Sequence, residues 1–125
     1  MTVTHTGARR FDRGAPNFQR MTREERSLGR GGLYRFYDAE QRPLYFGIAT
    51  SFEVRWDAHR LSSPWWPLAE YVALSFYPTS RRPLYHFETA AIWNEWPAFN
   101  RKTQGVPGGN LSRLAPPRPT FPKRD

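Results

Sequence analysis

The sequence contains no cysteine, which excludes disulfide bonds and thiolate metal sites. It has no run approaching the roughly 20 apolar residues that a membrane-spanning helix needs, so we expect no insertion into a membrane. The first residues lack the apolar core of a secretory signal peptide, and we therefore expect a cytoplasmic protein. With 125 residues, the chain is long enough for one domain with a single modest core.

Positive charge is what the chain has in excess. Lysine and arginine number 19 against 11 aspartate and glutamate residues, which gives a formal charge of +8 and a pI near 10.6. Nearly all of these cations are arginine, whose forked guanidinium suits contacts with phosphate. A basic surface with interleaved aromatic residues favours a nucleic acid as the partner over an anionic membrane.

Two aromatic-rich runs lie between residues 32 and 47, separated by the polar segment 38–42, and this pattern is typical of a β-hairpin. Side chains alternate between the faces of a strand. One face of the first run therefore carries Tyr34 and Phe36, and the other Leu33, Arg35 and Tyr37. Tyr45 shares a face with Gly47, which has no side chain. The two tyrosines fit either simple packing or a place where a phosphate or a water binds.

A helix is predicted after the hairpin, because Thr50 and Glu53 form a capping-box pattern and Pro64 ends the segment near residues 61–63. Its predicted core stripe is Val54, Ala58 and Leu61. Arg55 and His59 stand four residues apart and so lie on one helical face. Trp65 and Trp66 follow, and they fit either capping of the core or stacking on a nucleobase.

A third strand is predicted over 69–77 from its two-residue period, followed by a second helix over 83–95 that stops before Trp96-Pro97. The predicted fold class is therefore α+β, a small three-stranded antiparallel sheet flanked by helices in the order β-β-α-β-α. Glu88 falls within the apolar stripe of the second helix, which consists of Leu84, Phe87, Ala91 and Ile92. A carboxylate there is costly unless it is paired or bound. It fits either an ion pair with an arginine or a metal site.

The two ends of the chain are predicted to have little regular structure. Residues 1–30 are basic, with arginines that fit either a loose electrostatic arm on nucleic acid or a solvated leader. Within them, Thr22 and Glu25 predict a short capped helix. Residues 104–125 are rich in proline and glycine and suggest a flexible tail. Its segment 116–119 is a weak match to a proline-rich ligand for a protein partner.

Residues 31–103 resemble the GIY-YIG endonuclease superfamily as a stand-alone single domain. Gly32-Leu33-Tyr34 matches the first signature triplet and Tyr45-Phe46-Gly47 the second. Arg55 stands at the position of the family arginine, and His59 at a position that the family fills with histidine or tyrosine. Glu88 matches the metal-binding glutamate, and Asn100 closes a segment similar to the family's Pro-x-Tyr-Asn. Phe46 and Phe99 depart from the usual residues, and Ile48 replaces a lysine found in DNA-repair members.

The resemblance implies a divalent-metal-dependent endonuclease, a hydrolase that cuts DNA phosphodiester bonds and leaves a 5′-phosphate and a 3′-hydroxyl. Glu88 would hold one Mg²⁺ or Mn²⁺ ion. Arg55 would bind a non-bridging oxygen of the phosphate. Tyr45 is the implied general base, with Tyr34 and His59 as the other residues for this role. We expect Arg55 and the metal to lower the tyrosine pKa.

Further contacts with nucleic acid are predicted for Arg35, Arg60, Trp65, Arg101 and Lys102. The alternative function is a basic DNA- or RNA-binding module that keeps the same fold without turnover. A third hypothesis is an interaction protein that binds its partner through the proline-rich tail.

Overall fold

The computed structural model describes residues 3–77, 84–100 and 111–123. The fold is α+β, as the sequence predicts, with a wholly antiparallel sheet. The elements in chain order are β1 (Thr4–His5), β2 (Arg9–Arg10), α1 (Arg23–Leu28), β3 (Gly32–Tyr37), β4 (Pro43–Ala49), α2 (Phe52–Ser62), the 3-10 helix η1 (Trp66–Leu68), β5 (Tyr71–Phe76), α3 (Leu84–Glu95) and the 3-10 helix η2 (Leu111–Leu114). None of the helices in these ranges is long and apolar enough to cross a membrane.

The sheet has five strands, and the prediction of three is therefore wrong. Its order is β1-β5-β3-β4, and β2 also pairs with β5. The predicted hairpin and third strand form β3, β4 and β5, with β3 at the centre. The two additional strands come from the leader, where Thr4 pairs with Phe76 and Arg9 with Val72. These strands have two residues each, which is too short for their alternation to be recognised in the sequence.

The leader is therefore part of the folded domain, in contrast to the little fixed structure predicted for it. Phe11 and Met21 are buried in the core. The predicted capping box is present at α1, where the Thr22 hydroxyl accepts from the Glu25 amide and the Glu25 carboxylate accepts from the Thr22 amide. Arg9 donates two hydrogen bonds to Glu25, at 2.6 and 2.8 Å, which ties the leader strand to this helix.

The end of the tail also packs on the sheet instead of extending from it. Phe121 meets the rings of Tyr37 and Tyr71 edge-on, with centroids 5.1 and 5.3 Å apart. The Thr120 carbonyl accepts from the Ala8 amide, and Arg118 donates to the Asn94 carbonyl at 2.8 Å. The segment predicted as a proline-rich ligand is thus engaged within the domain. Residues 104–110 lie outside the described ranges.

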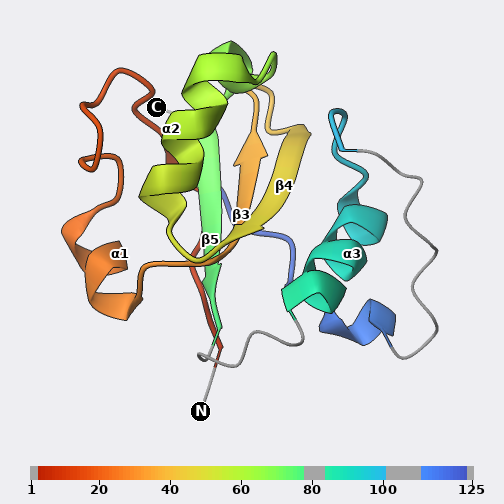
Figure 1. Ribbon diagram of the computed structural model, residues 1–125. Helices are drawn as coiled ribbons and strands as arrows, with labels where there is room; N and C mark the ends of the chain where they lie inside the picture. Colours follow the sequence, from red (N-terminus) through yellow and green to blue (C-terminus); the bar gives the residue numbers. More distant parts are fainter. Residues whose placement is uncertain (1–2, 78–83, 101–110, 124–125) are drawn as a thin grey trace.

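Both faces of the sheet are buried. The face with Tyr34 and Phe36 packs against α2 in an aromatic cluster that includes Trp56. The opposite face, with Leu33 and Tyr37, packs against Ala91 and other residues of α3. The alternation along β3 therefore predicts correctly which of these residues lie on the same face. Figure 1 shows α2 and α3 on either side of β4, which is the edge strand of the sheet.

Helix α2 has the predicted extent but a different buried face. Its N-cap is Ser51, whose hydroxyl accepts from the Val54 amide, so the predicted Thr50–Glu53 capping box is wrong. The predicted stripe is also wrong, since Val54 is 57% and Leu61 70% exposed, and Ala58 is exposed as well. The helix buries Phe52, Glu53, Trp56 and His59. The aromatic residues of this helix also recur at helical spacing. Their burial removes more apolar area from water than burial of Val54, Ala58 and Leu61 would, which explains why the aromatic face is the buried one.

Helix α3 ends at Glu95, before Trp96-Pro97, as the sequence predicts. Trp96 adopts a positive φ of 54°, and the chain then runs back along the edge of β4. The Ala98 and Phe99 amides donate to the Pro43 and Leu44 carbonyls. The predicted turn at residues 78–83 lies outside the described ranges.

Candidate active site at the edge of β4

Five of the six predicted catalytic residues influence one another at the edge of β4. They come from four elements: Tyr34 from β3, Tyr45 from β4, Arg55 and His59 from α2, and Glu88 from α3. The charges of Arg55 and Glu88 act on both tyrosines, and Arg55 lies beside both phenols. Residues distant in the sequence thus share one electrostatic environment.

A glycine makes the position of Tyr34 possible. Tyr34 is opposite Gly47 in the β3–β4 register, and its ring lies over that glycine. A Cβ atom at Gly47 would overlap the phenol oxygen, so any larger residue would displace it. This contact gives a physical reason for the last glycine of the second triplet.

His59 continues the hydrogen-bonded chain that begins at Tyr34. Its Nε2 atom lies 2.7 Å from the Tyr34 hydroxyl, and its Nδ1 atom lies 2.6 Å from the Ser63 hydroxyl. The imidazole packs against both the Tyr45 ring, 5.0 Å away, and the Trp65 ring, 4.7 Å away. Burial, followed by the nearby Arg55 charge, lowers the pKa of His59 to about 4. The ring is therefore neutral at pH 7.

Both phenols have a raised pKa, which differs from the expected lowering. Arg55 does act to lower the pKa of Tyr34 and of Tyr45, but burial has the larger effect in both cases. For Tyr45, the negative charge of Glu88 raises the pKa further. Tyr34 is wholly buried, whereas Tyr45 is half-buried. Tyr45 is thus the phenol of the two that solvent reaches.

Glu88 is half-buried, and burial raises the pKa of its carboxyl above the ordinary value. Arg55 and a hydrogen bond from the Ile48 backbone act in the opposite direction. Among the described residues, no cation lies within 4.0 Å of this carboxylate as an ion-pair partner. The structure instead places the buried ion pair at Glu95, the last residue of the same helix, where Arg35 Nη1 lies 2.8 Å away. Sequence reasoning missed Glu95.

The Asn100 side chain is hydrogen-bonded to the edge of β4. Its carboxamide oxygen accepts from the Phe46 amide at 2.8 Å, and its nitrogen donates to the Phe46 carbonyl at 2.9 Å. A carboxamide is well suited to this because it carries both a donor and an acceptor. The Glu88 carboxylate accepts a hydrogen bond from the backbone of Ile48, two residues after Phe46 along β4. Asn100 therefore holds the chain after α3 against β4, next to the residues above.

Of the residues predicted to contact nucleic acid, the three in the described ranges, Arg35, Arg60 and Trp65, are not brought together. Arg35 is wholly buried on the opposite face, in the pair with Glu95. Trp65 is 2% exposed and stacks on Tyr45 at 5.0 Å, so it caps the core and leaves no face for a nucleobase. Arg60 is exposed and donates to Asp57 at 2.9 Å. Arg101 and Lys102 lie outside the described ranges.

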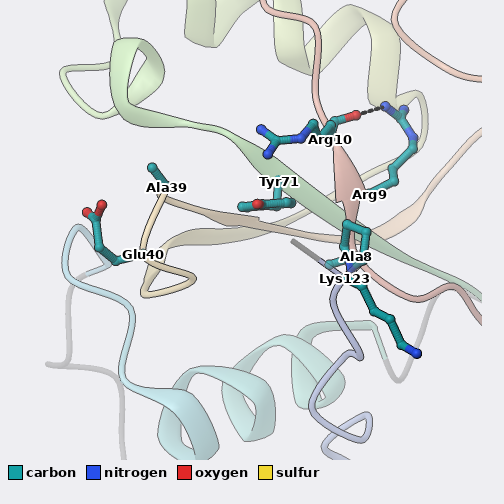
Figure 2. A pocket seen from close by; sticks show the side chains of 8 residues that line it. Ala8, Arg9, Arg10, Ala39, Glu40, Tyr71 and Lys123 are labelled. Carbon is teal, nitrogen blue, oxygen red and sulfur yellow. Dashed lines mark hydrogen bonds between the residues drawn. The ribbon is translucent and has the colours of Figure 1, made fainter. Parts of the chain in front are cut away.

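The leader arginines do not form a loose arm in the described residues. Ion pairs join five of them to acidic side chains: Arg9, Arg10, Arg13, Arg20 and Arg26. Near β2 lies a groove of about 740 Å³, lined by Arg9, Arg10, Tyr71 and Lys123 among others (Figure 2). In it, Arg10 lies over the Tyr71 ring at 5.3 Å. None of the six predicted catalytic residues lines this groove.

A divalent cation would find one carboxylate at the edge of β4. The described ranges contain no group of three or more histidine, cysteine, aspartate or glutamate side chains arranged to hold a metal. Glu88 nevertheless fits an ion that takes its other ligands from water and from a substrate phosphate, because its carboxylate is a hard oxygen donor without a nearby ion-pair partner among those residues. Burial that disfavours its bare negative charge also fits a bound cation.

Comparison of the chain with protein-family models, with curated proteins and with solved structures gives no match. The GIY-YIG resemblance therefore rests on the signature residues themselves and on their arrangement.

Proposed function

We propose that the protein is a divalent-metal-dependent endonuclease that hydrolyses DNA phosphodiester bonds. The observation that supports this most is the common electrostatic environment of Tyr34, Tyr45, Arg55 and Glu88, to which His59 is hydrogen-bonded. A guanidinium can stabilise the charge that develops when a phosphodiester is hydrolysed, and a half-buried carboxylate can hold a metal ion for the same purpose. The net charge of +8 favours a polyanionic substrate.

Arg55 binds the phosphate in this proposal. Arg55 is exposed, so a phosphate can reach it from solvent. Its guanidinium also lies beside the two phenols. A guanidinium donates two parallel hydrogen bonds to phosphate oxygens. Its positive charge then stabilises the additional negative charge that develops when a water attacks the phosphorus.

Tyr45 accepts the proton of the attacking water while its own hydroxyl proton passes to solvent, because it is the phenol that solvent reaches. The new P–O bond forms as the bond to the 3′ oxygen breaks, which leaves a 5′-phosphate and a 3′-hydroxyl. Glu88 would hold Mg²⁺ or Mn²⁺, and such an ion supplies positive charge to the leaving oxygen. Tyr34 and the neutral His59 form a second proton path beside Tyr45.

The proposal is tested by cleavage of plasmid, branched and single-stranded DNA with Mg²⁺ or Mn²⁺, with and without a chelator. We expect cleavage that the chelator abolishes. Glu88→Gln should abolish it as well, since the neutral amide is a poor ligand for the cation but still accepts from Ile48. Glu24→Gln is the matched control, because Glu24 is exposed on α1.

DNA binding by both variants and by the wild type, without cleavage under any condition, would contradict the nuclease proposal. It would favour the alternative of a basic nucleic-acid-binding module. Full cleavage by Glu88→Gln would contradict the metal role of this residue.

A further inference from the structure

Ser63 occupies a fixed position at the end of α2. Its backbone amide donates to the His59 carbonyl at 2.8 Å, which makes it the C-cap of the helix. Its backbone is extended, with φ of −91° and ψ of 124°, as expected for a residue that precedes a proline, here Pro64. The backbone thus holds the Ser63 hydroxyl 2.6 Å from the Nδ1 atom of His59.

The two hydrogen bonds of His59 are coupled through its tautomer. A neutral imidazole has one N–H, so one ring nitrogen donates and the other accepts. Arg55 carries only donors, and its positive charge acts on the Tyr34 phenol. That charge favours a Tyr34 hydroxyl whose lone pairs face Arg55 and whose proton points to His59 Nε2, 2.7 Å away. Nδ1 must then carry the ring proton, and Ser63 accepts it.

We propose that Ser63 is a positioning residue that holds the ring proton of His59 on Nδ1, so that Nε2 accepts a hydrogen bond from the Tyr34 phenol. In this arrangement the Tyr34 O–H donates to Nε2 and the Nδ1–H donates to Ser63, which holds the Tyr34 phenol in place beside Tyr45. This inference rests on the proposed function for its role in cleavage, but the tautomer itself does not depend on that function.

In the described part of the chain, three ionisable groups face His59. They are Tyr34 from β3, Tyr45 from β4 and Arg55 from its own helix. The third ring packed on it, Trp65, does not titrate. The positive charge of Arg55 disfavours a second proton on the ring, so His59 stays neutral and Nε2 remains a hydrogen-bond acceptor for the Tyr34 hydroxyl.

The tautomer is measured by ¹⁵N NMR of the imidazole of His59 in the full-length protein at pH 7. We expect the wild type to carry its proton on Nδ1, and Ser63→Ala to shift the ring toward the Nε2 tautomer. Ser62→Ala is the matched control, since the exposed Ser62 hydroxyl bonds to the Ala58 carbonyl. An Nε2 tautomer in the wild type, or an unchanged tautomer in Ser63→Ala, would overturn the proposal.

Cleavage provides the second readout. Ser63→Ala should lower kcat by about 10-fold, part of the roughly 10²–10⁴ that acid–base catalysis supplies, with KM unchanged. Ser63→Thr should restore kcat because it keeps the hydroxyl, and Ser62→Ala should match the wild type. Equal kcat in Ser63→Ala and Ser62→Ala would overturn the role in cleavage. If the wild type does not cleave DNA, the proposed function fails, while the NMR result still decides the tautomer.

Discussion

Two sets of residues around the sheet each contain an arginine, a glutamate and tyrosine, one on the face covered by α3 and one at the edge of β4, but they differ in how far their charges are paired. In the closed set, the Arg35 guanidinium and the Tyr37 hydroxyl both donate to the Glu95 carboxylate, at 2.8 and 2.6 Å, and the Arg35 and Glu95 side chains are nearly inaccessible to solvent. In the open set, which consists of Tyr34, Tyr45, Arg55 and Glu88, the arginine is exposed and the carboxylate has no ion pair within the described residues.

This difference in charge pairing indicates that the closed set is structural and that the open set is available to a ligand. The closed set also binds the Pro117 carbonyl, so it joins β3, α3 and the tail. Its charges are already neutralised in place. The open set keeps a guanidinium and a carboxylate that solvent reaches, and a phosphate with a cation would complete both. The same three residue types thus serve stability on the face covered by α3 and the proposed chemistry at the edge of β4.

Breaking the closed set should have the largest effect on stability. Glu95→Gln leaves the charge of Arg35 buried without a counter-charge, and we expect a loss of about 3–5 kcal/mol in the free energy of unfolding. Urea denaturation measures this loss. Glu88→Gln is the control and should change stability far less, since burial already disfavours the charged form of Glu88. Equal losses in the two variants would contradict the distinction between the sets.

Removing the arginine of the open set should affect cleavage and leave the fold intact. We expect Arg55→Ala to lower kcat by about 10²–10³-fold, the usual effect of losing one group that stabilises transition-state charge. Arg42→Ala, at an exposed position of the hairpin turn, removes the same charge and should have little effect. Kinetics on plasmid DNA together with thermal unfolding separate the two quantities. A destabilised Arg55→Ala would place Arg55 among the structural residues.

The pH dependence of stability gives the smallest and most specific contrast. The pKa of His59 is about 4 in the folded protein against an ordinary value of 6.5, so between these values the unfolded chain binds the proton first. Stability should therefore fall as the pH drops from about 6.5 to about 4, by about 1.4 kcal/mol for each unit of pKa difference. The raised pKa of Glu88 acts in the opposite direction above pH 4.5.

Comparing the wild type with His59→Gln isolates the contribution of the histidine. The variant should lose less stability over this pH range, as measured by urea midpoints at each pH. Parallel pH profiles for the two proteins would show that His59 is not buried as a neutral ring.

The sequence by itself determined the central hairpin, the extent of both long helices, the sharing of faces along β3 and the identity of the candidate site residues. These follow from local rules, namely alternation, proline boundaries and the spacing of the signature triplets. Even the end of α3 at Glu95 follows from the proline two residues later.

The other features of the fold and of the site depend on the tertiary structure. Which face of α2 is buried, which glutamate pairs with which arginine, and where the leader and the tail pack all depend on contacts between residues far apart in the chain. Ser63 shows the limit well: its spacing of four residues from His59 is visible in the sequence, but only the fold places its hydroxyl on the imidazole. Burial and pairing are properties of the whole packed chain, and local patterns carry no measure of them.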